Sequence, residues 1–141
     1  MVDKKNYTSF KHGGFTLLEI VIVIIITGVL AGLAISRFFK TIEFSRANEA
    51  LSQLSAIRRA MDRCYLINSN YSSCNNFSTL DVEDPASLSN VHFTYSLGTP
   101  GATTFTITAT RNTFNGGDGS SIITINENGV KSGSGSFSNI Q

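Results

Sequence analysis

The chain has 141 residues, 41% of them hydrophobic, and a formal net charge of +1 at pH 7. This length allows one domain plus an anchor, and the near-neutral charge argues against a broad basic surface for nucleic acid. A catalytic nucleophile, base and orienting acid cannot be assembled from these residues, and His12 and His92 form no metal-ligand pattern with the two cysteines. The sequence therefore predicts a structural protein, not an enzyme, with no cofactor and no metal.

Residues 15–36 form an apolar segment. These 22 residues contain one ionisable side chain, Glu19, and a helix of that length would be roughly 33 Å long, enough to span a bilayer core. A carboxylate in hydrocarbon is unfavourable by about a few kcal/mol, so Glu19 is a functional candidate. In the simpler interpretation, Glu19 reaches the headgroup layer and stabilises the helix N-terminus.

A short basic stretch that ends in glycine precedes this segment. The residues of the combined pattern are Lys4, Lys5, Lys11, Gly14, Phe15, Thr16, Leu17, Leu18 and Glu19. The pattern resembles the N-terminal signature of type IV pilins and type II secretion pseudopilins, which carry a class III signal peptide. In that family a prepilin peptidase cuts before a Phe, the new amine is methylated, and a Glu follows at the fifth position of the mature chain.

The resemblance implies cleavage between Gly14 and Phe15, N-methylation of Phe15, and assembly through Glu19 and the Phe15 amine. It implies a homopolymeric filament, with a prepilin peptidase, an assembly ATPase and a platform protein as partners. Of the two filament types, a type IV pilus is the expected one, because the sequence has no acidic cluster for the calcium site of a major pseudopilin. The monomer is expected in the bacterial inner membrane and the filament outside the cell. Ser36 stands near a position where the family usually has proline, so no proline kink is expected there.

Several alternatives stay open. The chain could be the major pseudopilin of a type II secretion system, although no acidic cluster of the kind expected for that subunit's calcium site is present. It could be a singly anchored binding module in which residues 15–36 are a tether. It could also carry an ordinary secretory signal cleaved near Gly32-Leu33-Ala34. Nucleic acid is an unexpected partner, because the predicted sheet carries only Arg111 and Lys131 as basic residues.

The apolar segment continues into an amphipathic one without a break. Because no Pro or Gly occurs within residues 33–70, a single helix is predicted from Phe15 to about Ile67. Its apolar stripe is Ala47, Ala50, Leu51, Leu54, Ile57, Met61, Cys64 and Tyr65. Its charged row is Arg37, Lys40, Glu43, Arg46 and Glu49. This row would be either a solvated face or a set of salt bridges between subunits.

Cys64 and Cys74 lie at the predicted end of this helix. They would close an 11-residue loop outside the membrane, where thiols oxidise. A disulfide between them is therefore predicted. Family members often carry a disulfide nearer the C-terminus, so its position here departs from the family pattern.

The remaining residues predict a small antiparallel sheet. Alternating or apolar runs at residues 91–97, 104–110 and 122–125 indicate strands, and Asn128-Gly129 indicates a hairpin turn. His92 falls on the polar face of the first strand, and the glycine-rich residues 115–119 form a turn with one carboxylate. The tail, residues 132–141, is expected to be mobile.

The predicted fold class is α+β, with a long N-terminal helix packed on three or four antiparallel strands. The expected divisions are a leader at 1–14, a membrane or filament-core helix at 15–36, an amphipathic half at 37–67, and a loop-and-sheet head at 68–141.

We expect the mature protein to begin at Phe15, because the charged leader stops there. N-terminal sequencing or intact mass measurement of the exported protein tests this. A mature chain that begins at Ile35 would instead establish an ordinary secretory signal.

Overall fold

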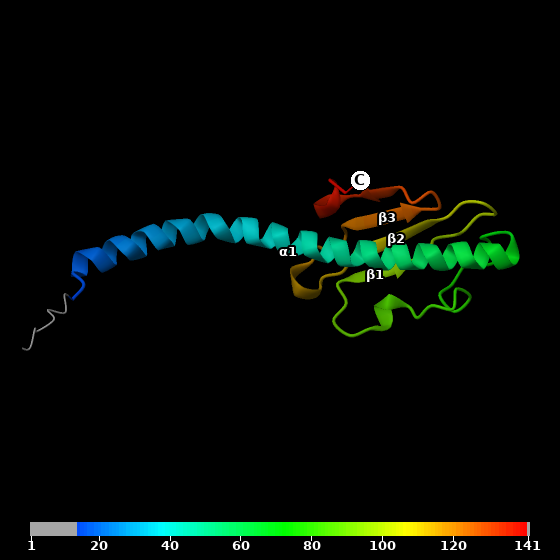
Figure 1. Ribbon diagram of the computed structural model, residues 1–141, viewed down its shortest axis with the longest axis horizontal. Helices are drawn as coiled ribbons and strands as arrows, with labels where there is room; N and C mark the ends of the chain where they lie inside the picture. The colour runs from blue at the N-terminus through cyan, green and yellow to red at the C-terminus, as the bar shows by residue number, and fades with distance from the viewer. Residues whose placement is uncertain (1–13, 141) are drawn as a thin grey trace, which may run out of the picture. The chain divides into compact units, whose positions relative to one another are not determined.

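The structure, a computed structural model, describes residues 14–140, apart from the side chain of Ser36. It contains one long helix followed by a four-stranded antiparallel sheet in the order β1-β2-β3-β4 (Figure 1). The helix and strands are α1 (Leu17–Asn68), β1 (Phe93–Ser96), β2 (Thr106–Arg111), β3 (Ile122–Asn126) and β4 (Lys131–Gly133). The short 3-10 helices are η1 (Pro85–Ser87), η2 (Phe114–Gly116) and η3 (Gly135–Phe137). The predicted α+β fold is confirmed.

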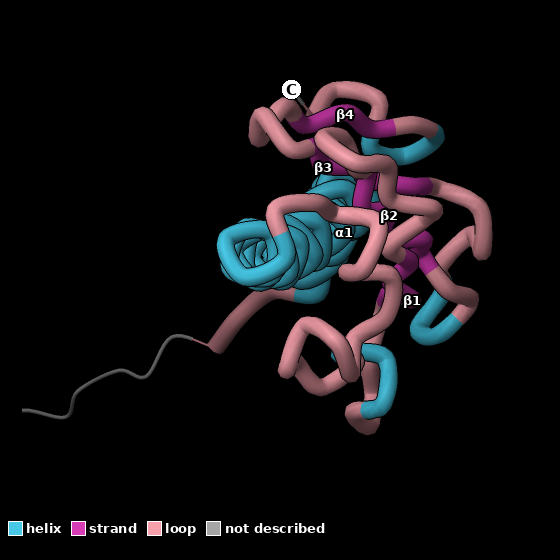
Figure 2. The backbone as a smooth tube through the Cα atoms, turned by 90° about the vertical axis from the view of Figure 1, so that its right-hand side faces the viewer, coloured by secondary structure: helices cyan, strands magenta, loops and turns pink. Residues whose placement is uncertain are grey.

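The chain divides into two compact units, Met1–Phe39 and Lys40–Gln141, and α1 contributes to both. The predicted leader lies outside the described residues except for Gly14. In the second unit, the stripe predicted on α1 is buried against the sheet, and Figure 2 shows α1 along one face of the strands. Leu54 and Ile57 of α1 belong to one core with Ile107 of β2 and Ile123 of β3, all fully buried.

This packing follows from two matching periodicities. Side chains three and four positions apart share one face of a helix, whereas alternate side chains share one face of a strand. In β2 the buried positions are Ile107, Ala109 and Arg111, and β2 pairs in register with β3, where Ile107 is opposite Ile125. The sheet therefore presents a single apolar face, and the second half of α1 covers it.

The β3–β4 hairpin confirms the predicted turn but uses one more residue than a two-residue loop. Gly129 N–H donates to the Asn126 carbonyl (2.9 Å), and Asn126 N–H donates to the Val130 carbonyl (3.2 Å). Gly129 has a φ of 77°, whereas Glu127 and Asn128 have negative φ values. This is the pattern of a three-residue loop that ends in a left-handed glycine.

The tail is packed, so the prediction that it is mobile was wrong. Phe137 is 3% exposed, and its ring lies 5.6 Å from that of Phe93. Ser134 N–H donates to the Ile122 carbonyl (2.9 Å), and Ile140 packs against the core. Two apolar side chains hold this polar, glycine-rich segment against the head, because Phe137 is buried in the core and Ile140 is partly buried against it.

The loop after α1 is fixed at both its ends. Cys64 and Cys74 are joined by a disulfide with their Cα atoms 6.1 Å apart. Between them, the ring of Tyr71 lies 4.5 Å from that of Tyr65 and 4.7 Å from that of Phe105. The backbone of Tyr71 also donates to the Ala102 carbonyl (3.0 Å). The disulfide loop is thereby joined to the end of α1 and to the β1–β2 connection.

We expect intact protein to gain two mass units on reduction of the Cys64–Cys74 bond. Replacing both cysteines with serine should lower the free energy of unfolding by roughly 2–3 kcal/mol, because an 11-residue loop is no longer closed in the unfolded chain. Denaturant unfolding of the full chain in detergent measures the loss. Two free thiols in freshly isolated protein would contradict the prediction.

Candidate assembly site

The first helical turn holds Glu19 in a defined place. Helix α1 begins at Leu17, and the hydroxyl of Thr16 accepts the backbone N–H of Glu19 (3.2 Å), so Thr16 is the N-cap. A Thr followed three residues later by Glu is the sequence pattern of a capping box, a signal that the sequence analysis did not use. The carboxylate of Glu19 therefore lies at the positive end of the helix dipole, as the simpler interpretation required.

The residues of the predicted cleavage site precede this turn. Gly14, Phe15 and Thr16 are exposed and lie outside the helix, and Phe15 is 79% exposed. The Thr16 cap thus separates a non-helical Gly14-Phe15 bond from the start of α1. The cleavage and methylation at this bond remain predictions.

The first half of α1 has no buried side. Its large hydrophobic side chains range from 37% exposed at Val21 to 82% at Leu17. Within residues 14–140, α1 is the one helix long and apolar enough to cross a membrane by length and composition. The hydroxyl of Thr27 donates to the Val23 carbonyl (2.8 Å), so this polar group is satisfied inside the helix. The space around Gly28 and Gly32 is open, and α1 continues without interruption through Ser36.

The charged row after this segment has a function that the sequence analysis did not predict. The sequence predicts either a solvated face or salt bridges between subunits for this row. Glu43 fits neither prediction, because its side chain forms an ion pair with the sheet of the same chain. Its carboxylate accepts two hydrogen bonds from Arg111 of β2, at 3.1 Å from Nε and 3.2 Å from Nη2. Arg46 also donates to Glu43. A charged side chain of α1 is thus paired with a charged side chain of the sheet.

Arg111 is 1% exposed and fully satisfied. Its Nη1 donates to the carbonyls of His92 (3.1 Å), Asn112 (3.0 Å) and Phe114 (3.0 Å), and its guanidinium lies 5.8 Å from the ring centre of Phe93. A buried arginine requires this many acceptors because an unpaired charge in the interior is strongly unfavourable. One side chain therefore joins α1, β1, β2 and η2.

The glycine-rich turn is shaped around the same arginine. A Cβ at Gly117 would lie 2.5 Å from Cζ of Arg111 and 1.9 Å from the Asn112 carbonyl oxygen, so only glycine fits. Asp118 caps the next residues by accepting the N–H groups of Ser120 (3.0 Å) and Ser121 (2.9 Å) and the Ser121 hydroxyl. The hydroxyl of Ser121, followed by the two N–H groups, lowers the pKa of Asp118 to about 2. The turn thus supports the fold.

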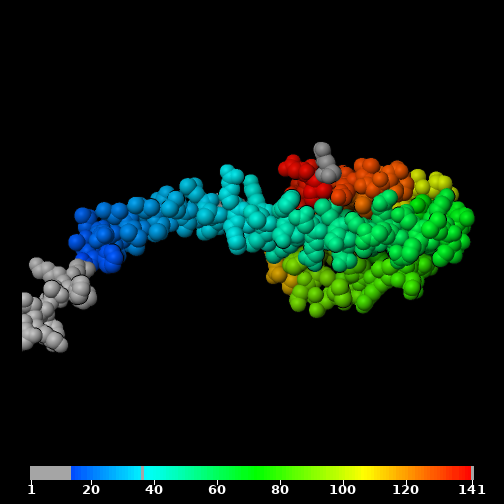
Figure 3. Space-filling model, in the orientation of Figure 1, coloured from blue at the N-terminus to red at the C-terminus, as the bar shows by residue number. Residues whose placement is uncertain are grey.

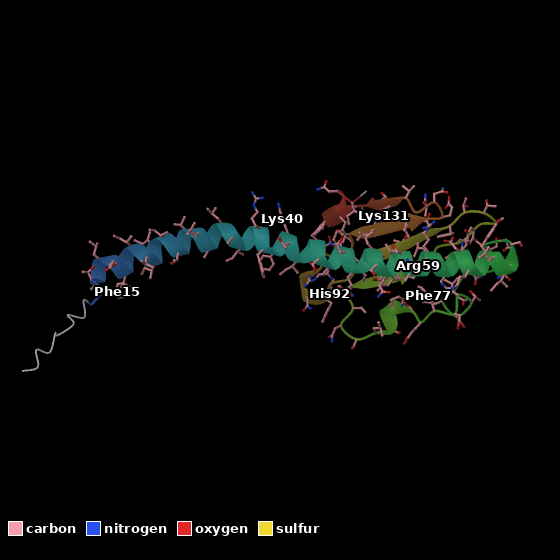
Figure 4. All side chains as sticks on the ribbon, viewed as in Figure 1. Phe15, Lys40, Arg59, Phe77, His92 and Lys131 are labelled. Carbon is pink, nitrogen blue, oxygen red and sulfur yellow. A yellow bond between two sulfur atoms is a disulfide. The ribbon has the colours of Figure 1, made fainter. Side chains whose placement is uncertain are left out.

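His92, placed on the polar face of the first strand by the sequence and so expected to face solvent, is half-buried. Its side chain is 19% exposed, and Nδ1 lies 3.7 Å from Oε2 of Glu49, too far for a hydrogen bond. Nδ1 is buried and has no hydrogen-bond partner in the part of the chain that the structure describes. Figure 4 labels His92 at the start of β1. Among residues 14–140, no group of three or more His, Cys, Asp or Glu is placed to hold a metal ion.

Glu49 of α1, which lies near His92, also affects the pKa of Tyr95 in β1. Burial, and then the charge of Glu49, raise the pKa of Tyr95 to about 12. The phenol therefore stays neutral over the physiological pH range.

We expect Glu43→Gln to lower the free energy of unfolding at pH 7 by about 2–3 kcal/mol, because the buried Arg111 loses its counterion. The hydrogen bond from Arg111 holds the pKa of Glu43 below its ordinary 4.5, although burial opposes this. The contribution is therefore complete above pH 4.5 and disappears as the pH falls through the lowered pKa. Denaturant unfolding of the full chain in detergent at pH 7 and at about pH 3 measures both effects.

Glu83→Gln is the matched control. Glu83 is an exposed carboxylate that forms no ion pair among residues 14–140, and its loss should change the free energy of unfolding by about 0.5 kcal/mol at most. Equal stability of the Glu43→Gln protein and the parent at pH 7 would show that the ion pair does not hold α1 on the sheet.

Two family models match the chain. Residues 9–35 match the "Prokaryotic N-terminal methylation motif", and residues 37–120 match "Type IV minor pilin ComP, DNA uptake sequence receptor". The solved structure of the non-core minor pilin PilV of Neisseria meningitidis has a TM-score of 0.50 and 20% sequence identity. The aligned region covers 64% of this chain and 84% of the PilV chain. The two proteins therefore share a fold.

Curated relatives match over shorter stretches. The type II secretion system core protein G of Escherichia coli (strain K12) is 39% identical over 75 residues, which are 53% of this chain and 52% of that protein. The corresponding Klebsiella pneumoniae protein is 43% identical over 61 residues, 43% of this chain and 44% of its own length. The type IV major fimbrial protein FimA of Dichelobacter nodosus is 38% identical over 53 residues, 38% of this chain and 34% of that protein.

This chain thus spans about half or less of the length of these curated relatives. The minor pilin model, by contrast, covers more than half of this chain and includes the second half of α1 with β1 and β2. With the methylation motif directly before it, the chain belongs to the type IV pilin and pseudopilin family and carries the domain of the ComP minor pilins.

Proposed function

We propose that this chain is a structural subunit of a type IV pilus, held in the inner membrane as a monomer and polymerised through the first half of α1. Residues 1–14 would be the leader and 15–36 the stem; residues 37–67 and 68–141 would form the head. The observation that carries the proposal is a helix segment exposed on every side with one carboxylate in its first turn. Such a segment leaves lipid only if other apolar helices replace the lipid.

Glu19 would give this assembly its register. Cleavage before Phe15 creates a positive amine four residues from Glu19, and in the interior of a helix bundle neither charge is stable alone. A contact between Glu19 of an incoming subunit and the amine of a neighbouring one satisfies both. At an effective dielectric of about 20 and a separation near 4 Å, such a contact is worth roughly 4 kcal/mol before desolvation.

The prepilin peptidase, the assembly ATPase and the platform protein belong to this proposal as partners. The minor pilin domain over residues 37–120 supports a pilus, whereas the similarity to core protein G supports the alternative of a secretion pseudopilus. Electron microscopy of intact cells that produce the chain discriminates the two, because only a pilus extends as a filament from the cell surface.

DNA reception is a second candidate, since the family description names a receptor for a DNA uptake sequence. The charges of this chain argue for placing it second. Residues 37–141 contain eight Lys or Arg and eight Asp or Glu. Arg111 is buried against Glu43, and Arg58 donates to the Glu127 carbonyl at 3.2 and 3.0 Å. Non-specific DNA binding depends on several phosphate contacts from free basic side chains.

We expect Glu19→Gln and Glu19→Ala to leave the protein inserted and cleaved but unable to form filaments. Either change leaves the Phe15 amine without a partner and makes the monomer more stable in lipid, so subunits stay in the membrane. The ratio of sheared filament to membrane-bound subunit, measured by quantitative immunoblotting, is the readout.

Thr16→Ala is the matched control for the helix-capping function of this turn. It removes the hydroxyl that accepts the Glu19 N–H but keeps the carboxylate, and should weaken the helix start by about 1 kcal/mol without preventing assembly. Normal filament yield from both Glu19 variants would favour the tethered binding module. Loss of filaments from Thr16→Ala alone would assign the function to the cap.

A further inference from the structure

Two arginines near the exposed end of α1 have no partner within the described part of the chain. Arg59, Arg63 and Leu66 are spaced by four and three residues, so they share one face of the helix, and all three are exposed. No hydrogen bond or ion pair joins either arginine to another group among residues 14–140. Two like charges four positions apart destabilise an isolated helix. We call Arg59, Arg63 and Leu66 the basic row.

Large apolar side chains are exposed in and beside the basic row. Leu66 is 82% exposed, and its neighbour Ile67 is 83% exposed. These residues follow the core stripe of α1 and lie in the head unit, so their exposure differs from that of the membrane-length segment at the start of the helix. Two arginines next to an exposed leucine have the composition of a protein-binding surface.

A segment of opposite charge lies in the connection between α1 and β1. Asp81 and Glu83 are exposed on either side of Val82, which packs against the core and so fixes the segment to the head. Glu83 accepts the exposed Ser87 hydroxyl (3.3 Å) but has no cationic partner among residues 14–140, whereas Asp84 accepts the Ala86 N–H (2.9 Å) and caps η1. Leu88, 53% exposed, follows η1. We call Asp81, Glu83 and Leu88 the acidic segment.

In the part of the chain that the structure describes, the two patches form no ion pair with each other. Arginines elsewhere in the head, by contrast, are paired, as Arg46 and Arg111 are with Glu43. Figure 4 labels Arg59 on α1 and Phe77 in the connection that leads to the acidic segment. The green end of α1 and the yellow-green connection after it are both visible on one side of the head in Figure 3.

We propose that the basic row of one subunit binds the acidic segment of a second copy of this chain. Each patch offers two charges and an exposed leucine, so the surfaces match in charge sign and in apolar content. Because the two patches are different parts of the chain, the contact is head-to-tail. Each subunit then keeps one patch free for the next copy, and the contact repeats along a filament instead of closing into a dimer. The proposal rests on the filament function proposed above.

A second copy fits these patches better than DNA does. Phosphates would be attracted to Arg59 and Arg63, but they would leave the exposed Leu66 in contact with water. A protein surface with two carboxylates beside an aliphatic side chain satisfies the whole row, and this chain carries such a surface.

Charge reversal tests the pairing. Arg59→Glu with Arg63→Glu, and separately Asp81→Lys with Glu83→Lys, should each lower the ratio of sheared filament to membrane-bound subunit by roughly tenfold, because like charges then face each other. All four changes in one chain restore opposite charges and should bring the ratio back to within about threefold of the parent. Recovery in the combined variant is a result that mere damage to the fold cannot produce.

Lys131→Glu is the matched control, since Lys131 is an exposed cation on β4 outside both patches and its reversal should leave the ratio unchanged. Normal filament yield from either charge-reversed pair, or no recovery in the combined variant, would overturn the pairing. If the reversed arginines leave filaments intact but abolish binding of duplex DNA, the basic row is a phosphate contact and the proposal fails. If the parent itself forms no filaments, the proposed function fails first, and the two failures are distinguishable.

Discussion

The first half of α1 cannot be stable in water, and the rest of the structure depends on that constraint. A helix that is apolar on every side must be covered by lipid or by other apolar helices. Among the residues that the structure describes, none covers it, because the large hydrophobic side chains of this half remain exposed. The head must therefore form its core without them. It does so with the second half of the same helix, whose buried stripe covers the sheet.

The Glu43–Arg111 pair lies where α1 changes from an exposed apolar helix to the helix that covers the sheet. Glu43 comes before the first fully buried core residue of the helix, Ala47, and Arg111 ends β2. The pair constrains where α1 lies on the sheet, because Nε and Nη2 of the buried Arg111 take their acceptors from Glu43 and would lose them if the helix shifted. The glycine at position 117 belongs to the same arrangement, since any side chain there would occupy the space of the guanidinium.

The sequence predicted the parts of this fold that depend on local periodicity. The helix, the first three strands and the core stripe are properties of short segments. Arg111 continues the alternation of Ile107 and Ala109, yet a charged residue is not expected inward unless its partner is known, and Glu43 lies 68 residues away. The burial of Phe137 against Phe93 is likewise a long-range contact. The helix cap at Thr16 differs from these long-range contacts, because the Thr16 and Glu19 pattern that predicts it is local and could have been found in the sequence.

The stem and the head would contribute differently to assembly. Apolar side chains on all sides of a helix give a large favourable burial but almost no preferred axial position, because each turn resembles the next. Register must therefore come from groups that are unfavourable in every position but one. On the proposed assembly, Glu19 would supply this inside the bundle, where an unpaired charge is costly. The basic row and the acidic segment would supply it at the surface, where a mismatch brings like charges together. Surface pairs are weak individually and are screened by salt. It follows that the stem sets whether subunits leave the membrane, whereas charge pairs set which neighbours they meet.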